Sequence, residues 1–579
     1  MNFNELSLNK KDWICLAIVI IFSLLCTAKM MMFTMSGCIL DPDIALYLLS
    51  ALKYAGLDSF NVAYPEDLFY TPIISFLTSL IFRMGYVDKN AIIIVTSILS
   101  FLGYVGLYCL LKRRFDSLLS LTGVAIYGSI LLVIFNISKG MVDIPCLSLS
   151  IWALLFAIMA IDDDPKYFFV AFPLLTIAFF TKYTAGFTLP LIILYYCMKR
   201  DIIGKFDCLL SDRETFKQAL KSYLHSKEFK YIIISLLASL ILTVIICKTL
   251  ILDFGGSLTF FDQSVNTFNG HSFSKSGVDH VSSKSYYVKR FTDMLFGSSD
   301  HSLALAWLAY GICGLGLAIK FIKNFSILKS EKEPFKTRHL NKALIISCFV
   351  LLFVSFLTFK VIPNHMACNI SILIALTFVY SILEKYDFDN KIVSLDLLFL
   401  ACFLINFIFA SLYGIKVERY ALPFVPPIIY FIVLGLEGLV EAVDFNELSK
   451  LRLDTIIPII IIILFMTSTA CFLAPIEYER TNDVIFALNY QGFKGDLADA
   501  CDYIKNNVSD YHNETFASNY HHSRIIRWYL NVNVTVLDKK DPGLHEFDNT
   551  TYAILSEDLN LTNYHKIKNF GDFDIYKHD

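Results

Sequence analysis

Long runs of apolar residues, separated by short charged stretches, recur from the N-terminus to about residue 475. A helix needs about 20 consecutive apolar residues to cross the hydrocarbon core of a bilayer, and most of these runs approach that length. We therefore predict about thirteen membrane segments. They cover residues 13–33, 91–111, 118–135, 146–161, 167–180, 187–196, 231–252, 303–322, 343–359, 368–383, 392–413, 428–443 and 456–472. A shorter apolar run, residues 72–84, predicts a helix at the membrane interface.

Lysine and arginine gather on one side of these segments. Lys10 and Lys11 precede the first segment, and Lys112-Arg113-Arg114 follow the second. Because cytoplasmic loops are enriched in these residues, we predict a plasma-membrane protein with a cytoplasmic N-terminus and an extracytoplasmic C-terminus. Glycosylation motifs of the N-x-Ser/Thr type, which are modified only outside, also occur in the C-terminal tail. They begin at Asn507, Asn513, Asn533, Asn549 and Asn560.

The tail has the composition of a soluble domain. Helices are predicted at residues 496–506 and 519–529, and strands at 515–518, 532–537, 552–556 and 573–576. Alternating elements of this length are typical of a small α/β domain. The predicted fold is thus a polytopic α-helical membrane domain, residues 1–475, followed by a small extracytoplasmic α/β domain, residues 476–579.

Composition agrees with this fold class. Of the 579 residues, 56% are hydrophobic and 17% are charged, against about 45–50% and about 25% in soluble proteins. The net charge is −3 and no long basic block occurs, so we expect membrane lipids and no nucleic acid as partners. The 14 cysteines show no spacing typical of a zinc site.

Candidate chemistry begins in the first outer loop, residues 34–90. Asp41 has the place of a helix N-cap, Pro42 that of the first helical residue, and Gly56 that of the stop. Asp43 and Tyr47 then lie on one face of this helix, four residues apart. Two interpretations of Asp43 stay open: it is a catalytic base, or it only stabilises the positive end of the helix dipole.

A second carboxylate and two cations are predicted at the same membrane face. Asp143 lies at the boundary of the segment 146–161, and Lys182 and Arg419 lie at outer ends of apolar runs. Lysine and arginine are usually enriched on the cytoplasmic side, so basic residues on the outer side are expected to bind an anion. The alternative is that Asp143 is solvated and that the two cations reach lipid headgroups. Two carboxylates beside two cations suit general-base chemistry next to a bound phosphate.

These residues belong to four short motifs in a fixed order. The motifs are Asp43-x-x-x-Tyr47, Tyr70-Thr71-Pro72, Met141-x-Asp143-x-Pro145 with Thr181-Lys182-Tyr183, and Arg419-Tyr420-x-Leu422-Pro423 with Pro426. Over about residues 10–475, the sequence resembles the GT-C class of membrane glycosyltransferases. It is most similar to the protein O-mannosyltransferase-like group, glycosyltransferase family 39, and to the lipid A aminoarabinose transferases.

The resemblance implies transfer of a sugar from a polyprenyl (dolichyl-type) phosphate to an acceptor hydroxyl on the outer face. The acceptor is a protein, a lipid or a glycan. Asp43 would act as general base with assistance from Asp143. Substrate binding would fall to Tyr47, Lys182, Arg419 and Tyr420.

The sequence departs from the family at two places. The family often has Asp-Glu where this chain has Asp43-Ile44, and some relatives carry an acid or histidine where Tyr70 and Thr71 stand. No cofactor is certain, a divalent metal ion stays open and its ligands are unknown. Glu66 and Asp67 have no assigned role. The histidines of the outer loops fit solvated residues better than ligands; they are His271, His280, His301 and His365.

A transporter or lipid flippase is the alternative function. Transporters tend to carry paired repeats and to place charged residues near the bilayer midplane. This sequence shows no repeat, and its acids and cations lie at the ends of apolar runs. The pattern therefore favours the glycosyltransferase.

Overall fold

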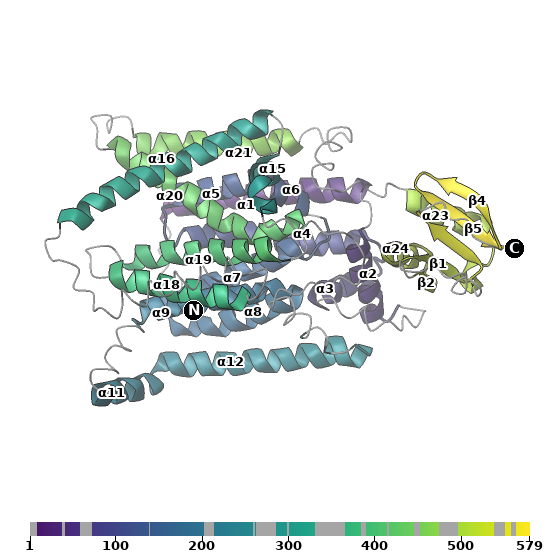
Figure 1. The fold of residues 1–579 in the computed structure, drawn as a ribbon, viewed down its shortest axis with the longest axis horizontal. Helices are drawn as coiled ribbons and strands as arrows, with labels where there is room; N and C mark the ends of the chain where they lie inside the picture. The colour runs from purple at the N-terminus through teal and green to yellow at the C-terminus, as the bar shows by residue number, and fades with distance from the viewer. Residues whose placement is uncertain are drawn as a thin grey trace.

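The computed structural model shows a bundle of roughly parallel helices with a small β-sheet at one end (Figure 1). We call the end of the bundle next to the sheet the sheet end, and the opposite one the far end. The structure describes residues 9–37, 41–57, 72–137, 139–201, 213–256, 258, 261, 285–297, 300–330, 365–383, 390–413, 416–444, 452–473, 496–537, 550–556 and 563–579.

Within these residues, eight helices are long and apolar enough to cross a membrane. They are, or contain, α1 (Lys10–Gly37), α4 (Asn90–Leu111), α7 (Asp143–Asp162), α12 (Lys227–Ile246), α16 (Asp300–Ser330), α19 (Asn390–Leu412), α20 (Val425–Asp444) and α21 (Leu453–Leu473). A ninth crossing is supplied if α5 (Ser117–Ser129) and α6 (Leu131–Ile137), which are bent by 71° to each other, form one span. The chain is a multi-pass membrane protein.

The predicted count of about thirteen spans is too high for the described part of the chain. α8 (Phe168–Thr181) has 14 residues and α9 (Thr188–Lys199) has 12, and the 3₁₀ helix η4 (Tyr183–Phe187) separates them. In α18 (His365–Leu383), the apolar stretch is also short. The segment predicted at 343–359 lies outside the described residues. An apolar run shows only that a helix is buried. A short helix packed inside the bundle is as apolar as a spanning helix, so the two cannot be told apart by hydropathy alone.

Five further short helices belong to the described membrane part. α2 (Pro42–Ala55) and α3 (Pro72–Arg83) lie at the sheet end (Figure 1). α3 covers the short apolar run of residues 72–84, and its place at a membrane interface stays a prediction. α14 (Tyr286–Lys289) and α15 (Phe291–Phe296) precede α16. α11 (Arg213–Leu224) lies at the far end, before α12 (Figure 1).

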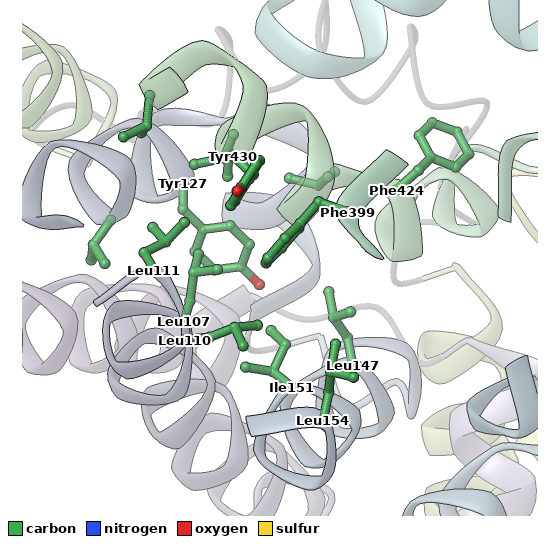
Figure 2. Packing of buried hydrophobic residues seen from close by; sticks show 14 of the residues in the cluster. Leu107, Leu110, Leu111, Tyr127, Leu147, Ile151, Leu154, Phe399, Phe424 and Tyr430 are labelled. Atoms are coloured by element: carbon green, nitrogen blue, oxygen red, sulfur yellow. The ribbon is translucent and has the colours of Figure 1, made fainter. Parts of the chain in front are cut away.

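The core between the long helices is packed with aliphatic and aromatic side chains. Figure 2 shows Leu107, Leu110 and Leu111 of α4 facing Leu147, Ile151 and Leu154 of α7, with Phe399 and Tyr430 above them. The rings of Phe399 and Tyr430 stack with centroids 3.9 Å apart. This layer joins α4, α7, α19 and α20 into one body.

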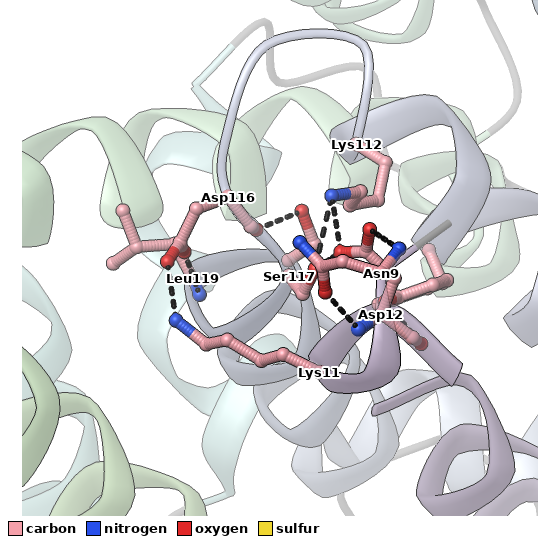
Figure 3. Close-up of polar contacts among 9 residues, drawn as sticks. Asn9, Lys11, Asp12, Lys112, Asp116, Ser117 and Leu119 are labelled. Atoms are coloured by element: carbon pink, nitrogen blue, oxygen red, sulfur yellow. Dashed lines mark hydrogen bonds and ion pairs between the residues drawn. The ribbon is translucent and has the colours of Figure 1, made fainter. Parts of the chain in front are cut away.

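Charged side chains at the far end pair with one another. Lys112, at the end of α4, donates to Asp12 of α1 at 2.8 Å and to Ser117 of α5 at 2.9 Å (Figure 3). Lys11 pairs with Asp116 at 3.0 Å. These helix ends were all predicted on one side of the membrane, and the structure brings them together.

A more buried ion pair lies at the same end. Both Nη atoms of Arg114 donate to the Glu437 carboxylate at 2.9 Å, and Nε lies 3.4 Å from Asp396. The Arg114 side chain is only 5% exposed. The pair therefore ties the end of α4 to α19 and α20.

The C-terminal region forms a mixed five-stranded sheet in the order β2-β1-β3-β5-β4. β1 is parallel to β2 and β3, whereas β5 is antiparallel to β3 and β4. The elements are α23 (Asp496–Asn507), β1 (Phe516–Asn519), α24 (Tyr520–Leu530), β2 (Val534–Leu537), β3 (Tyr552–Leu555), β4 (Tyr564–Phe570) and β5 (Phe573–His578). Both helices and four strands were predicted. β4 was missed because its exposed, mixed sequence carries no apolar run.

The C-terminal region docks on the sheet end of the bundle. α24 packs on α2, and the rings of Trp528 in α24 and Phe82 in α3 stack with centroids 6.1 Å apart. One apolar cluster contains buried residues of α2, α3, α4, α23, α24 and the sheet. The predicted domain boundary at residue 475 falls in a stretch outside the described residues, and the boundary stays a prediction.

We predict that Arg114→Gln lowers the free energy of unfolding by about 3 kcal/mol, because it removes the buried cation of Asp396 and leaves Glu437 with Lys320 alone. Thermal or denaturant unfolding in detergent measures the change. Lys11→Gln is the matched control. Its ion pair is half exposed and should contribute less than about 1 kcal/mol. Equal losses in the two variants would contradict the difference in burial.

Candidate active site

Asp43 lies in the first turn of α2, whose ends are fixed by its own sequence. The Asp41 carboxylate caps the helix by accepting the N–H of Asp43 at 2.8 Å, and Pro42 occupies the first helical position. Gly56 ends the helix at φ 73°, a left-handed conformation that glycine adopts without steric cost. The predicted caps are confirmed. The Asp41 carboxylate is engaged in capping, and that of Asp43 points to other partners.

The first of these partners is Arg419 in the 3₁₀ helix η7 (Glu418–Phe424). Arg419 Nη2 donates to Oδ2 of Asp43 at 2.9 Å, and Nη1 lies 3.5 Å from the Met141 sulfur. The side chains of Asp43 and Arg419 are each 24% exposed. This ion pair joins the first helix after α1 to the segment before α20 and stays partly open to solvent.

A buried lysine fixes the backbone in front of Arg419. Lys416 Nζ donates to the carbonyls of Ala410 at 2.8 Å and Ser411 at 2.7 Å, and also to that of Tyr413. The last carbonyls of a helix lack intrahelical partners and favour a nearby cation. Lys416 therefore caps the end of α19 and sets the point from which η7 starts.

A second buried contact involves Glu418, the neighbour of Arg419. Glu418 is 6% exposed and accepts hydrogen bonds from Arg290 at 2.7 Å and from the Tyr286 hydroxyl at 2.6 Å. Burial, together with this carboxylate, raises the pKa of Tyr286 to about 12, so the hydroxyl keeps its proton at neutral pH. The chain before α16 thus holds η7 in place.

Asp143 and Lys182 form the other ion pair of the site. Lys182 Nζ lies 2.5 Å from Oδ1 of Asp143, and their side chains are 12% and 6% exposed. Asp143 opens α7, and Lys182 is the extended residue between α8 and η4. Lys182 Nζ also lies 4.9 Å from the ring centroid of Tyr420, within the range of a cation–π contact. Tyr420 follows Arg419 in η7, so it links the two ion pairs.

A cavity of about 850 Å³, a volume that includes space open to solvent, adjoins these residues. Its polar end is lined by Asp143, Lys182, Arg419 and Tyr420. The rest is lined mainly by apolar side chains of α4, α7, α9 and α19, among them Leu110, Ile151, Leu154, Leu191 and Phe399. Leu110, Ile151, Leu154 and Phe399 belong to the core seen in Figure 2. An elongated apolar ligand with an anionic head would match this lining.

The structure therefore brings together Asp43, Asp143, Lys182, Arg419 and Tyr420. Tyr47, the sixth predicted residue, is 5% exposed and belongs to the apolar cluster that α2 shares with Met141 and Val142. Glu66, Asp67, Tyr70 and Thr71 lie outside the described residues, as do His271 and His280. Among the residues that the structure does describe, no group of three or more histidine, cysteine, aspartate or glutamate side chains could hold a metal ion.

Several residues of the site were not found from the sequence. Arg524 of α24 lies 3.7 Å from Oδ1 of Asp43 and is 8% exposed. Arg290 and Lys416 hold η7 from outside the four motifs. The motif around Arg419 could have drawn attention to Lys416 and Glu418, its neighbours in sequence. No local signal marks Arg524, because its contact depends on how the tail docks.

We predict that Lys182→Met lowers the free energy of unfolding by about 3 kcal/mol, because Asp143 would keep its charge without its buried partner. Adding Asp143→Asn should recover about 2 kcal/mol, since the amide carries no charge to desolvate. Unfolding of the wild type, both single variants and the double variant in detergent gives the coupling energy. Additive losses would show that the two side chains do not interact.

Part of this chain matches a known protein family. Residues 70–208, which include Asp143 and Lys182, match the family described as dolichyl-phosphate-mannose-protein mannosyltransferase. A comparison with curated proteins finds no match.

Solved structures of ArnT from Cupriavidus metallidurans share the fold. The undecaprenyl phosphate-bound form has a TM-score of 0.53 at 11% identity and covers 98% of both chains. The apo form has a TM-score of 0.51 at 9% identity and covers 97% of both chains. The expected GT-C resemblance is thereby confirmed. Residues 70–208 thus match the dolichyl-phosphate-mannose-protein mannosyltransferase family, within a chain that has the fold of ArnT.

Proposed function

We propose that this protein transfers a sugar from a polyprenyl phosphate to an acceptor hydroxyl at the sheet end of the bundle. The observation that carries the proposal is the meeting of two ion pairs from four separate segments, Asp43–Arg419 and Asp143–Lys182, of which Asp143, Lys182 and Arg419 line a largely apolar cavity. We infer from the positive-inside bias that the sheet end faces the outside of the plasma membrane. The acceptor hydroxyl belongs to a protein, a lipid or a glycan.

The cavity suits the donor. Its apolar walls would take the first isoprenoid units of the lipid, and Lys182 and Arg419 at the mouth would hold the phosphate. Tyr420 packs against Lys182 and would keep its ammonium group at the mouth. Undecaprenyl phosphate is bound by the ArnT whose fold this chain shares.

The chemistry would be a single displacement with inversion at the sugar. The acceptor oxygen bonds to the anomeric carbon and gives its proton to Asp43, while the bond from that carbon to the phosphate oxygen breaks. Both electrons of the broken bond leave with the lipid phosphate. Lys182 and Arg419 then stabilise the charge that develops on this leaving group. A phosphate that attracts Arg419 would also release one oxygen of Asp43 for the proton.

The remaining predicted residues support these steps. Asp143 assists by holding Lys182 at the mouth. The proposal keeps Tyr47 for substrate binding, although its side chain is 5% exposed in the apolar cluster under Asp43 and does not line the cavity. A flippase would need to carry its cargo across the bilayer, whereas these charged groups are confined to one end of the cavity.

We predict that Asp43→Asn lowers the rate of transfer at least about 100-fold, as expected for loss of a general base. Binding of the donor should persist, because both cations remain. Transfer from a radiolabelled polyprenyl-phosphate sugar in membranes measures the rate. Asp41→Asn is the matched control, since asparagine caps a helix as well as aspartate does. Full activity of Asp43→Asn at unchanged expression would disprove the assignment of the base.

The cavity gives a second prediction. Ser150 lines it on α7, and Ser150→Phe should fill part of the space that the lipid would occupy. The KM for a long-chain donor should rise about tenfold, with less change for a donor that has a short lipid. Leu189→Phe enlarges a side chain that is 40% exposed on the outside of α9 and should leave KM unchanged. An equal response to both donors would place the lipid elsewhere.

A further inference from the structure

The C-terminal region reaches the proposed catalytic base directly. Arg524 is the fifth residue of α24 and lies almost fully buried where this helix packs on α2. Its Nη1 atom is 3.7 Å from Oδ1 of Asp43. The stacked pair of Trp528 and Phe82, one turn further along α24, fixes the same contact surface.

Two guanidinium groups therefore hold the two oxygens of one carboxylate. Arg419 of η7 contacts Oδ2, and Arg524 of α24 contacts Oδ1. They come from different elements, so the orientation of the Asp43 carboxylate is defined from two sides. If the donor phosphate attracts Arg419, Arg524 remains to keep Asp43 ionised and oriented.

Arg524 also changes the charge of the site. Among five described side chains, the two carboxylates Asp43 and Asp143 balance Lys182 and Arg419, so Arg524 gives this set one net positive charge. The phosphodiester of the donor carries one negative charge, and the released phosphate monoester carries about −1.5 to −2 at pH 7. A site with surplus positive charge stabilises this product-like state more than the substrate state, which is the condition for faster transfer.

We propose that Arg524 is a positioning residue for Asp43 and that the docked C-terminal region completes the active site. This inference rests on the proposed glycosyl transfer. Within the part of the chain that the structure describes, Asp41 at the helix cap and the Asp143–Lys182 pair beyond Tyr420 are further charged groups of this region. Removal of Arg524 thus takes away one of two cations that favour the ionised carboxylate.

Arg524→Gln in the full-length protein tests the proposal. We expect kcat to fall about 100-fold, as for a misplaced catalytic group. The acidic limb of the pH–activity profile should move to higher pH by about one unit, because the carboxylate loses a cation that favours its ionised form. Arg524→Lys should return the acidic limb close to its wild-type pH, because lysine keeps the positive charge. It should recover kcat less completely, because lysine lacks the planar guanidinium geometry.

Two variants separate this role from damage to the domain. Arg527, one turn further on α24, is 5% exposed and donates to the Val534 carbonyl at 2.6 Å, so Arg527→Gln disturbs the tail without removing a cation from Asp43. Lys568→Gln removes an exposed charge from β4, at the sheet edge opposite to β2. Neither should move the acidic limb.

Each outcome has a distinct meaning. Wild-type kcat and pH profile in Arg524→Gln would overturn the inference while leaving the proposed function intact. Alternatively, Arg524→Gln and Arg527→Gln could lose stability and activity to the same extent while the acidic limb stays in place. Arg524 would then be only a docking contact, and the inference would be overturned. A wild-type protein that cleaves no polyprenyl-phosphate sugar would instead refute the proposed function, and the inference with it.

Discussion

The ion pair between Asp43 and Arg419 is the interaction on which the arrangement of the sheet end depends. Opposite charges about 4 Å apart attract by about 4 kcal/mol near a protein surface, where the effective dielectric constant is about 20. Neither group is fully solvated in this structure, so each needs the other to offset its desolvation. Since Lys416 and Glu418 fix the backbone just before Arg419, the ion pair ties α2 to a backbone segment that is itself held in place.

The same electrostatic cost shapes the whole bundle. Ionised side chains are expensive in the hydrocarbon region, so they gather at helix ends and pair there. At the far end, Lys112 and Arg114 pair with carboxylates of α1, α19 and α20. At the sheet end, the ion pairs border an open cavity. The ion pairs at the far end hold helices together, whereas those at the sheet end border a cavity with space for a ligand.

Much of this arrangement follows from the sequence, because both hydropathy and capping are local signals. Alternating apolar runs placed Asp43, Asp143, Lys182 and Arg419 at one membrane face, and the structure joins them in one cluster. The bend between α5 and α6 was missed, although Gly128 and Ser129 directly precede the break at Ile130 and such pairs are common at kinks. Arg524 was missed for a different reason. Its contact with Asp43 is created by tertiary docking, which no local pattern encodes.

The two carboxylates of the site differ in a way that bears on their roles. The side chain of Asp143 is 6% exposed and is held by a lysine, whose charge is compact. That of Asp43 is 24% exposed and is held by guanidinium groups, which also bind phosphate well. In the proposed reaction, an incoming phosphate would compete for Arg419 and leave Asp43 facing the acceptor. The more buried Asp143 would keep Lys182 in place during this exchange. Burial and the chemistry of the paired cation thus favour Asp43 as the base and Asp143 as its support.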